Sequence, residues 1–325
     1  MKKQNLQKIN ISIKISSWGG YLPKNKITNK QMEYLVETTD EWIVQRTGIT
    51  QRFFAEEGEL TSDLALKSAL VSLQGRTHID AIIVATTTPD LTFPSTACIL
   101  QGKLKEHGIT SNFAFDVQAV CAGFVYGVVN AYSHIHAGLA KSVLVVGAET
   151  LSRILNMEDR ATCVLFGDGA GSCIIEETTD DDTSYIITSS LHSDGSHTQI
   201  LKTDGGISQK GTGFLEMSGP EVFKHAVSKM YSSINELIAK AEITKEQVDF
   251  IVPHQANARI LDSIAEKMQM PAEKFIKTIH LHANTSSATI PLAIYETLSQ
   301  LKKGDTVILE ALGGGLAWGG VVFKF

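Results

Sequence analysis

The feature that most constrains the fold of this 325-residue chain is an internal repeat. The apolar run IDAIIV at 79–84 recurs as VDFIV at 248–252, and the segment 139–144 recurs at 301–308. The glycine-rich segment 167–175 is similarly echoed at 314–323, so the three pairs keep their order. Repeated order at long spacing is typical of duplicated units, so the sequence predicts two similar halves.

Each half alternates apolar strand patterns with helical patterns. In the first half, strands are expected at 79–84, 113–117 and 143–146, and helices at 61–73, from 95 and from 121 to about 138. Short continuous apolar runs are typical of strands buried on both faces. The alternation predicts an α/β fold with mainly parallel central strands. The aspartate-rich stretch 178–184 is the expected connection, dividing the chain into halves 1–177 and 178–325.

Composition excludes several classes of function. Net charge is −6, so general nucleic-acid binding is not expected. No apolar run approaches the roughly 18–20 residues that a membrane span needs. Lys2, Lys3 and Lys8 are followed by the alternating pattern of a strand at 8–16 rather than by a signal-peptide core. We therefore expect a soluble, cytoplasmic protein.

The four cysteines differ in their surroundings. They form no CxxC pair, so neither a metal site nor a disulfide framework is predicted. Cys98, Cys163 and Cys173 are expected to be small buried apolar residues. Cys121 instead lies between a predicted strand and an apolar helix, where free N–H groups and the helix dipole favour an anion. We expect a lowered thiol pKa there, which makes Cys121 a candidate nucleophile; an inert core cysteine is the alternative.

Two polar residues of the second half are further candidates. His254 directly follows the strand at 248–252, and Asn284 precedes a helical pattern. Taken alone, a core histidine and a turn-capping asparagine explain both. However, an offset of about 165 residues carries Cys121 to the Asn284 segment, and ligands collect at the carboxyl ends of such strands. We therefore predict that Cys121, His254 and Asn284 come together.

Two glycine-rich segments are candidates for a functional role. Gly313–Gly315 precedes the last strand, where a backbone N–H could face a reacting oxygen; a flexible turn is the alternative. The segment 167–171 leads into a strand rather than a helix and lacks the spacing of a dinucleotide-binding loop. No nicotinamide cofactor is therefore expected.

Together these motifs resemble the β-ketoacyl-acyl carrier protein synthase III family of thiolase-fold condensing enzymes. The resemblance covers nearly the whole chain, in this order: Asp40–Ile43, Arg46–Ile49, Phe93–Ser95, Cys121–Phe124, Phe166–Gly171, Pro253–Asn257, Asn284–Ser286 and Gly313–Gly319. It implies five layers, α-β-α-β-α, built from two similar halves, and a homodimer. It implies no metal and no permanently bound cofactor.

The resemblance also implies a reaction in two stages. Cys121 would take an acyl group from a short acyl-coenzyme A, and the acyl enzyme would condense with malonyl-loaded acyl carrier protein, releasing carbon dioxide. His254 and Asn284 would hydrogen-bond the malonyl thioester carbonyl. The N–H groups of Cys121 and Gly314 would form the oxyanion hole of acyl transfer.

Further roles come from the same resemblance. Coenzyme A would be bound by Thr38, Trp42, Arg160 and Asn257, with its adenine between the indole and the guanidinium. The carrier protein would dock on Lys224, Arg259 and Lys267. Phe93, reaching across the dimer, and Phe166 would line the acyl pocket and favour a short primer such as acetyl; for Phe93, ordinary dimer packing is the alternative.

The chain departs from the family pattern at Ala283, where a glycine usually precedes the asparagine, and at Pro220, where a polar residue usually contacts coenzyme A. Bulk at Ala283 is expected to shift the asparagine loop slightly. Two other functions stay open at this point. One is a sibling condensing enzyme of secondary metabolism or with a longer or branched primer, and the other is a catalytically silent scaffold of the same fold.

Overall fold

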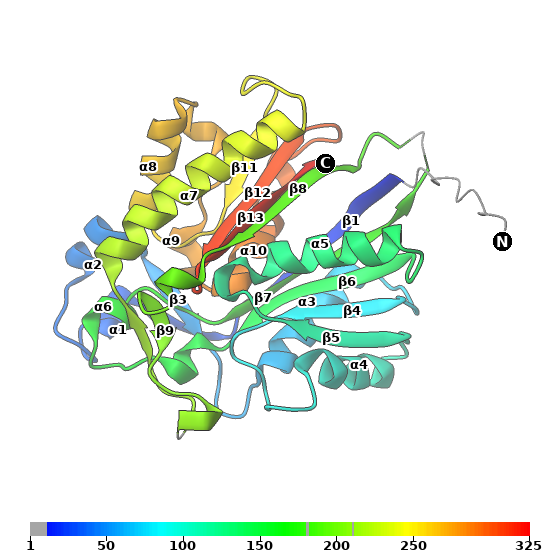
Figure 1. Cartoon of the computed structure of the whole chain (residues 1–325). Helices are drawn as coiled ribbons and strands as arrows, with labels where there is room; N and C mark the ends of the chain where they lie inside the picture. Colours follow the sequence, from blue (N-terminus) through cyan, green and yellow to red (C-terminus); the bar gives the residue numbers. More distant parts are fainter. Residues whose placement is uncertain (1–11, 180–181, 210) are drawn as a thin grey trace.

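The computed structural model describes residues 12–179, 182–209 and 211–325. Two main sheets dominate it (Figure 1). The first has the strand order β1 (Ser12–Tyr21), β7 (Gly169–Thr178), β6 (Ser142–Glu149), β4 (Ala81–Ala85) and β5 (Phe113–Val117). The second has the order β8 (Ile186–Ser193), β13 (Ala317–Lys324), β12 (Thr306–Gly313) and β11 (Phe250–Pro253).

The two sheets share one topology. In the first, β1, β7 and β6 are antiparallel neighbours, and β6, β4 and β5 are parallel. In the second, β8, β13 and β12 are antiparallel, and β12 and β11 are parallel. Among the described residues, the counterpart of β5 is one parallel bridge between Ile251 and Phe275. The prediction of two similar halves is confirmed; the boundary after residue 177, near the end of β7, stays a prediction.

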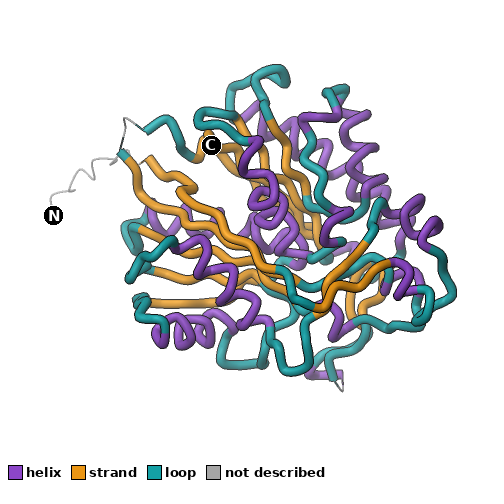
Figure 2. The backbone as a smooth tube through the Cα atoms, turned by 180° about the vertical axis from the view of Figure 1, so that it is seen from behind, coloured by secondary structure: helices purple, strands orange, loops and turns teal. Residues whose placement is uncertain are grey.

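Helices enclose and separate the sheets in the predicted five layers. Outside the first sheet lie α3 (Thr61–Leu73) and α4 (Thr96–Glu106), and outside the second lie α7 (Gly219–Lys240) and α8 (Ala258–Met268). The central layer consists of α5 (Gly123–His136) and α10 (Thr289–Thr297), which contact both sheets. Figure 2 shows these layers from behind. The thiolase-like α/β architecture is therefore confirmed.

The central strands follow the physical pattern of their sequences. All five residues of β4 and all eight of β12 are buried, because helices cover both faces of each sheet. The apolar faces of α5 and α10 then fill the space between the sheets, in one core with Trp18 and Phe323. No helix in the described part of the chain is long and apolar enough to cross a bilayer.

Shorter elements gather at one end of the molecule. They are β2 (Asn25–Thr28), α1 (Asn29–Met32), α2 (Asp40–Thr47), β3 (Gln51–Phe54), α6 (Arg160–Cys163), β9 (Leu201–Thr203), β10 (Leu215–Met217) and α9 (Ile279–His282). The predicted capping box of Thr28 and Gln31 is present, but the helix ends at Met32, and Leu35 is half exposed. Of the strand predicted at 8–16, residues 8–11 lie outside the described residues.

Each half contains a 3₁₀ turn directly before its central helix, and the two turns contact each other. They are η1 (Val120–Ala122), before α5, and η6 (Ser286–Ala288), before α10. Both begin with a residue at φ 50°, Val120 and Ser286, a conformation that side chains make costly. A sharp backbone turn thus starts each central helix, and each turn lies against a strand end of one of the sheets.

Candidate active site

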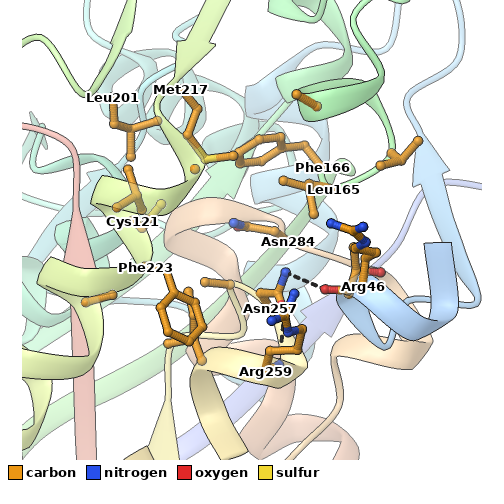
Figure 3. Close-up of a pocket in the computed structure, with 18 of the residues that line it drawn as sticks. Arg46, Cys121, Leu165, Phe166, Leu201, Met217, Phe223, Asn257, Arg259 and Asn284 are labelled. Carbon is orange, nitrogen blue, oxygen red and sulfur yellow. Dashed lines mark hydrogen bonds between the residues drawn. The ribbon is translucent and has the colours of Figure 1, made fainter. Parts of the chain in front are cut away.

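A cavity of about 500 Å³ lies between the two halves, and Cys121, His254 and Asn284 all line it. Cys121 belongs to η1, His254 directly follows β11, and Asn284 directly precedes Thr285 and η6. Figure 3 shows Cys121 and Asn284 facing the same space. The predicted meeting of the three residues is therefore what the fold produces, because both turns and the end of β11 meet where the sheets face each other.

Cys121 is almost fully buried, with 5% of its surface exposed. Burial raises the pKa of its thiol to about 12, against the effect of the nearby Ser286 hydroxyl, and the Glu149 carboxyl adds to the rise. The expected lowering of this pKa at a helix start is therefore wrong for the free protein. Cys121 lies in η1 ahead of α5, and loss of water outweighs the polar groups around it.

His254 is held rigidly behind the cavity. Its backbone N–H donates to the Glu310 carbonyl at 2.7 Å, and its ring Nδ1 lies 2.6 Å from Thr289 Oγ1. Burial lowers the pKa of the ring to about 3, so the imidazole is neutral at ordinary pH. A neutral ring of this kind can accept a proton at one nitrogen only.

Asn284 is fixed by its backbone and by its own side chain. Its N–H donates to the Leu165 carbonyl at 3.0 Å, and its carbonyl accepts from Gly167 N–H at 3.0 Å. Its Oδ1 accepts from the Ser286 N–H at 2.8 Å. With the carboxamide oxygen engaged, the Nδ2 group is the part of Asn284 that can donate to a molecule in the cavity.

Ala283 occupies a conformation that suits glycine. It has φ 60° and ψ −161°, and its side chain is completely buried. Only glycine adopts this region readily, so the alanine holds local strain. Asn284 nonetheless lines the cavity, and it forms the bridge to Phe166. The departure at Ala283 is accommodated by backbone strain next to the asparagine.

The opposite end of the cavity is cationic and aromatic. The Arg160 guanidinium carbon lies 4.6 Å from the centre of the Trp42 ring, and that of Arg46 lies 5.4 Å from it. Arg160 also donates to the Glu37 carbonyl at 2.9 Å. Because Trp42 and Arg160 already contact each other, the predicted position of adenine between them requires the two side chains to move apart. Arg46, four residues after Trp42 on α2, was missed, although that spacing predicts a shared face.

The other predicted coenzyme A residues lie around this end. Asn257 caps α8, accepting from Arg259 N–H at 2.9 Å, and its Nδ2 donates to the Arg46 carbonyl at 3.1 Å (Figure 3). It therefore ties α8 to α2 while lining the cavity. Thr38 lies outside the cavity lining, and its buried Oγ1 has no hydrogen-bond partner among the described residues.

The predicted docking and pocket residues separate into two groups. Arg259 and Phe166 line the cavity, whereas Lys224, Lys267 and Phe93 do not. Arg259, Lys224 and Lys267 are all exposed, and Lys267 lies over the Tyr231 ring. Phe93 is 82% exposed in the single chain, an unusual state for so large an apolar side chain.

The glycine run lies directly against η1. A Cβ atom at Gly313 would come within 2.6 Å of the Cys121 backbone nitrogen, and one at Gly314 within 3.5 Å of the Val120 side chain. At Gly313 only glycine permits so close an approach, whereas the Gly314 distance is an ordinary van der Waals contact. Gly314 therefore lies close to the turn that carries the nucleophile candidate, although it is not among the cavity-lining residues.

Sequence reasoning missed the apolar wall of the cavity. Leu201 and Met217 are cross-strand partners at the base of the β9–β10 hairpin, and Phe223 comes from α7. Figure 3 shows Leu201 and Met217 beside Cys121. Their strands are only three residues long, too short for a period-2 pattern to stand out.

The layered fold and this cavity define a class: the thiolase-fold condensing enzymes. The family model for 3-oxoacyl-[acyl-carrier-protein] synthase III matches residues 115–195, and the model for its C-terminal part matches residues 238–325. The chain is 50% identical over 317 residues to a β-ketoacyl-[acyl-carrier-protein] synthase III from Allorhizobium ampelinum, covering 94% of this chain and 97% of that protein. The chain therefore belongs to the β-ketoacyl-[acyl-carrier-protein] synthase III family.

Solved structures agree with this assignment. The synthase III from Aquifex aeolicus superimposes with a TM-score of 0.89 at 42% identity, over 96% of this chain and 100% of that chain. The synthase III from Pseudomonas aeruginosa gives a TM-score of 0.91 at 35% identity, over 97% and 98%. The resemblance seen in the sequence motifs is thus confirmed at the level of the family.

Proposed function

We propose that this protein condenses a short acyl-coenzyme A, with acetyl-coenzyme A the expected primer, with malonyl-acyl carrier protein and so starts fatty acid synthesis. The observation that carries the proposal is one cavity lined by a thiol, a neutral imidazole and a carboxamide whose oxygen is already engaged, from Cys121, His254 and Asn284. Membership of the synthase III family supports it.

In the first stage, the Cys121 sulfur attacks the thioester carbonyl and coenzyme A leaves. The N–H groups of Cys121 and Gly314 stabilise the oxyanion, since fixed donors in a dry site act strongly on developing charge. In the second stage, the malonyl group loses carbon dioxide. His254 and Asn284 hydrogen-bond its thioester oxygen as the enolate forms, and the enolate carbon attacks the acyl group on Cys121.

The cationic end of the cavity suits the coenzyme A nucleotide. Trp42 and Arg160 would open to hold the adenine, with Thr38 and Asn257 as further contacts. Lys224, Arg259 and Lys267 would then receive the acidic carrier protein, because all three are exposed cations on α7 and α8. Phe93 is largely exposed in the single chain, and a homodimer would bury it. In that dimer, Phe93 would enter the partner subunit's acyl pocket beside the partner's Phe166.

The test is intact-protein mass spectrometry after incubation with a panel of acyl-coenzyme A thioesters. We expect acetyl to be added once, at Cys121, with release of one coenzyme A thiol, and carbon dioxide to be released when malonyl-acyl carrier protein follows. A preference for longer or branched acyl groups would correct the primer. No adduct from any thioester would point to a silent protein of the same fold.

A further inference from the structure

A completely buried arginine lies among the short elements at the cationic end of the molecule (Figure 1). Burial lowers the pKa of the Arg52 guanidinium to about 10, so it stays charged at neutral pH. Arg52, on β3, donates to Asn29 Oδ1 at 2.8 Å, to the Val164 carbonyl at 2.9 Å and to the Ile27 carbonyl at 3.5 Å. All three acceptors are neutral. A buried cation depends on its acceptors, so this guanidinium strongly constrains the residues that supply them.

The bond from Arg52 fixes the orientation of the Asn29 amide. A guanidinium can only donate, so the amide oxygen faces Arg52 and the two Nδ2 protons point elsewhere. Nδ2 donates to Asp40 Oδ1 and to the Ile49 carbonyl, each at 2.8 Å. Asn29 is 1% exposed, and its oxygen and both amide protons are engaged. The opposite orientation of the amide would place its protons against those of Arg52.

Asn29 holds α2 at both of its ends. Asp40 is the first residue of this eight-residue helix, and Ile49 lies two residues beyond its last. A helix this short has little stability of its own, so its place in the fold depends on such tertiary contacts. Trp42 lies on α2, and its position therefore depends on the Asn29 amide.

Arg52 holds the facing helix directly. Val164, whose carbonyl accepts from the guanidinium, follows α6 and caps its end. Arg160 begins α6, and its guanidinium carbon lies 4.6 Å from the centre of the Trp42 ring. One buried cation thus connects the two helices whose side chains meet at the cationic end of the cavity. It contacts α6 directly and α2 through Asn29.

We propose that Asn29 and Arg52 are positioning residues that fix the distance between α2 and α6, so that the adenine of coenzyme A enters between these helices by movement of side chains alone. This inference rests on the proposed function and adds to it two residues outside the cavity lining. A site that is held ready for its ligand loses less free energy in ordering. The pair should therefore contribute to nucleotide binding and not to the chemistry at Cys121.

The Asn29→Asp variant removes the contacts to α2 and keeps the one to Arg52. Aspartate still offers an oxygen to the guanidinium, but it has no proton for Ile49 and places a second carboxylate against Asp40. We expect the concentration of acetyl-coenzyme A that gives half-maximal acylation of Cys121 to rise about 10-fold, the effect of one lost hydrogen bond to a charged group. The maximal rate of acylation should be unchanged.

Acetyl-pantetheine is the discriminating substrate, because it has the same thioester and arm but no nucleotide. We expect wild type to need more of it than of acetyl-coenzyme A, and Asn29→Asp to behave as wild type with it. Calorimetric titration with coenzyme A, which involves no turnover, should show the same loss of affinity as acylation. Equal impairment with both thioesters, or a lower maximal rate at unchanged half-saturation, would reveal a general structural effect and overturn the inference.

Exchanging the two side chains tests the contact itself. In the double variant Asn29→Asp, Asp40→Asn the amide is on α2 and donates to the carboxylate at position 29, which also pairs with Arg52. We expect this double variant to bind acetyl-coenzyme A more tightly than Asn29→Asp alone, although the bond to Ile49 stays lost. Equal losses in the single and double variants would show that the contact between positions 29 and 40 does not place α2, and the inference would be wrong.

Asn112→Asp is the matched control. Asn112 donates to Asp80 Oδ1 at 3.3 Å ahead of β4 and β5, so the same substitution brings the same two groups together away from the cavity lining. We expect no change with either thioester, and a loss confined to acetyl-coenzyme A in this control would refute the inference.

Two outcomes in wild type concern the proposed function. Equal half-saturation by the two thioesters would remove nucleotide binding beside Trp42, and this inference with it, while leaving condensation standing. Absence of any acyl enzyme from acetyl-coenzyme A would instead remove the proposed function as a whole.

Discussion

The turns η1 and η6 have the same backbone form but different side-chain roles. Each begins with a residue at φ 50°, and the next residue is Cys121 in η1 and Ser287 in η6. Cys121 faces the cavity, whereas the Ser287 hydroxyl oxygen lies 2.8 Å from the Ala85 carbonyl oxygen and 3.1 Å from a Glu149 carboxyl oxygen. In this duplicated fold one turn thus faces the cavity, and its counterpart contacts the opposite half.

The contrast extends to the strand that receives each turn. A Cβ at Gly313 of β12 would meet the Cys121 nitrogen at 2.6 Å, and one at Gly147 of β6 would meet the Ser287 carbonyl oxygen at 2.4 Å. Each half therefore presses its turn onto the sheet of the other. The lesson is that the cavity depends on a symmetric packing of two turns, of which η1 carries the proposed nucleophile, Cys121.

The largest expected difference is between Cys121→Ala and Ser287→Ala. Removing a nucleophile costs several orders of magnitude, so Cys121→Ala should lower the overall rate at least about 10⁴-fold and form no acetyl adduct. Ser287→Ala should still be acetylated, since it loses only an anchor. The measurement is adduct mass together with turnover. A folded Ser287→Ala protein that takes up no acetyl would erase the distinction between the turns.

Replacing Gly313 by alanine should mainly slow acyl transfer, whereas replacing Gly147 by alanine should mainly reduce stability. Gly313→Ala pushes on the turn that carries Cys121, and misplacement by about 1 Å can cost about 100-fold in acyl transfer. Gly147→Ala should mainly lower the free energy of unfolding, by about 1–3 kcal/mol. Rates and denaturant melts of both variants check this.

Gly102→Ala, in α4, is the control for these glycine substitutions, because a Cβ there meets nothing within 4 Å. It should leave activity unchanged and stability equal or slightly higher. Equal loss of acyl transfer in Gly147→Ala and Gly313→Ala would contradict the different roles of the two sheets.

Two buried carboxyls sharpen the comparison further. Glu149 of β6 accepts hydrogen bonds from two backbone N–H groups. Glu310 of β12 accepts one from the Ser233 hydroxyl at 3.0 Å, and its buried Oε1 has no hydrogen-bond partner among the residues that the structure describes. Burial raises both pKa values, that of Glu310 well above 4.5. Glu149→Gln would point an amide at N–H donors and should cost about 1–3 kcal/mol.

For Glu310 the sign is set by its raised pKa. The folded protein holds this proton when the unfolded chain has lost it, so the stabilisation is complete below about pH 4.5 and falls as pH rises towards the folded pKa. Glu310→Gln removes this dependence. Across that window, wild type should lose up to about 1.4 kcal/mol per pH unit relative to the variant. Parallel melting curves from pH 5 to about 8 would refute it.

The smallest expected effect is at Ala283. Glycine adopts φ 60°, ψ −161° without a Cβ clash, while it adds freedom to the unfolded chain. The backbone strain of Ala283 is modestly larger than the entropic cost of the more flexible unfolded glycine chain. Ala283→Gly should therefore raise the free energy of unfolding by about 1 kcal/mol. Thermal melting measures it, and a lower melting temperature would show that the alanine is not strained.

The sequence predicted the parts of this molecule that depend on local pattern. The bounds of α3 and β5 agree with the structure, because the apolar pattern of a helix or strand is a local signal in the sequence. The meeting of Cys121, His254 and Asn284 was predicted only with the repeat as a guide. The thiol pKa was predicted wrongly, because burial by distant segments outweighs the local helix start.

The partner of His254 was out of reach of the sequence for a related reason. Thr289 lies 35 positions further along the chain, and nothing in its neighbours marks it apart from any threonine that begins a helix. The Trp42–Arg160 contact is similar, since the two residues are distant in sequence and meet only through the packing of α2 and α6. Side-chain pairs of this kind follow from tertiary structure alone.

The depth of Cys121 also governs how the molecule tolerates oxidants and disulfides. Thiolates, not thiols, exchange with disulfides, so a sealed and protonated sulfur is chemically quiet. Cys98, which was expected to be buried, is instead exposed, and it presents the surface sulfur that a bulky reagent would meet first. Selective labelling of Cys121 therefore requires a narrow electrophile on a linker long enough to reach into the cavity. The same burial protects the thiol from oxidation and disulfide exchange when no substrate is bound.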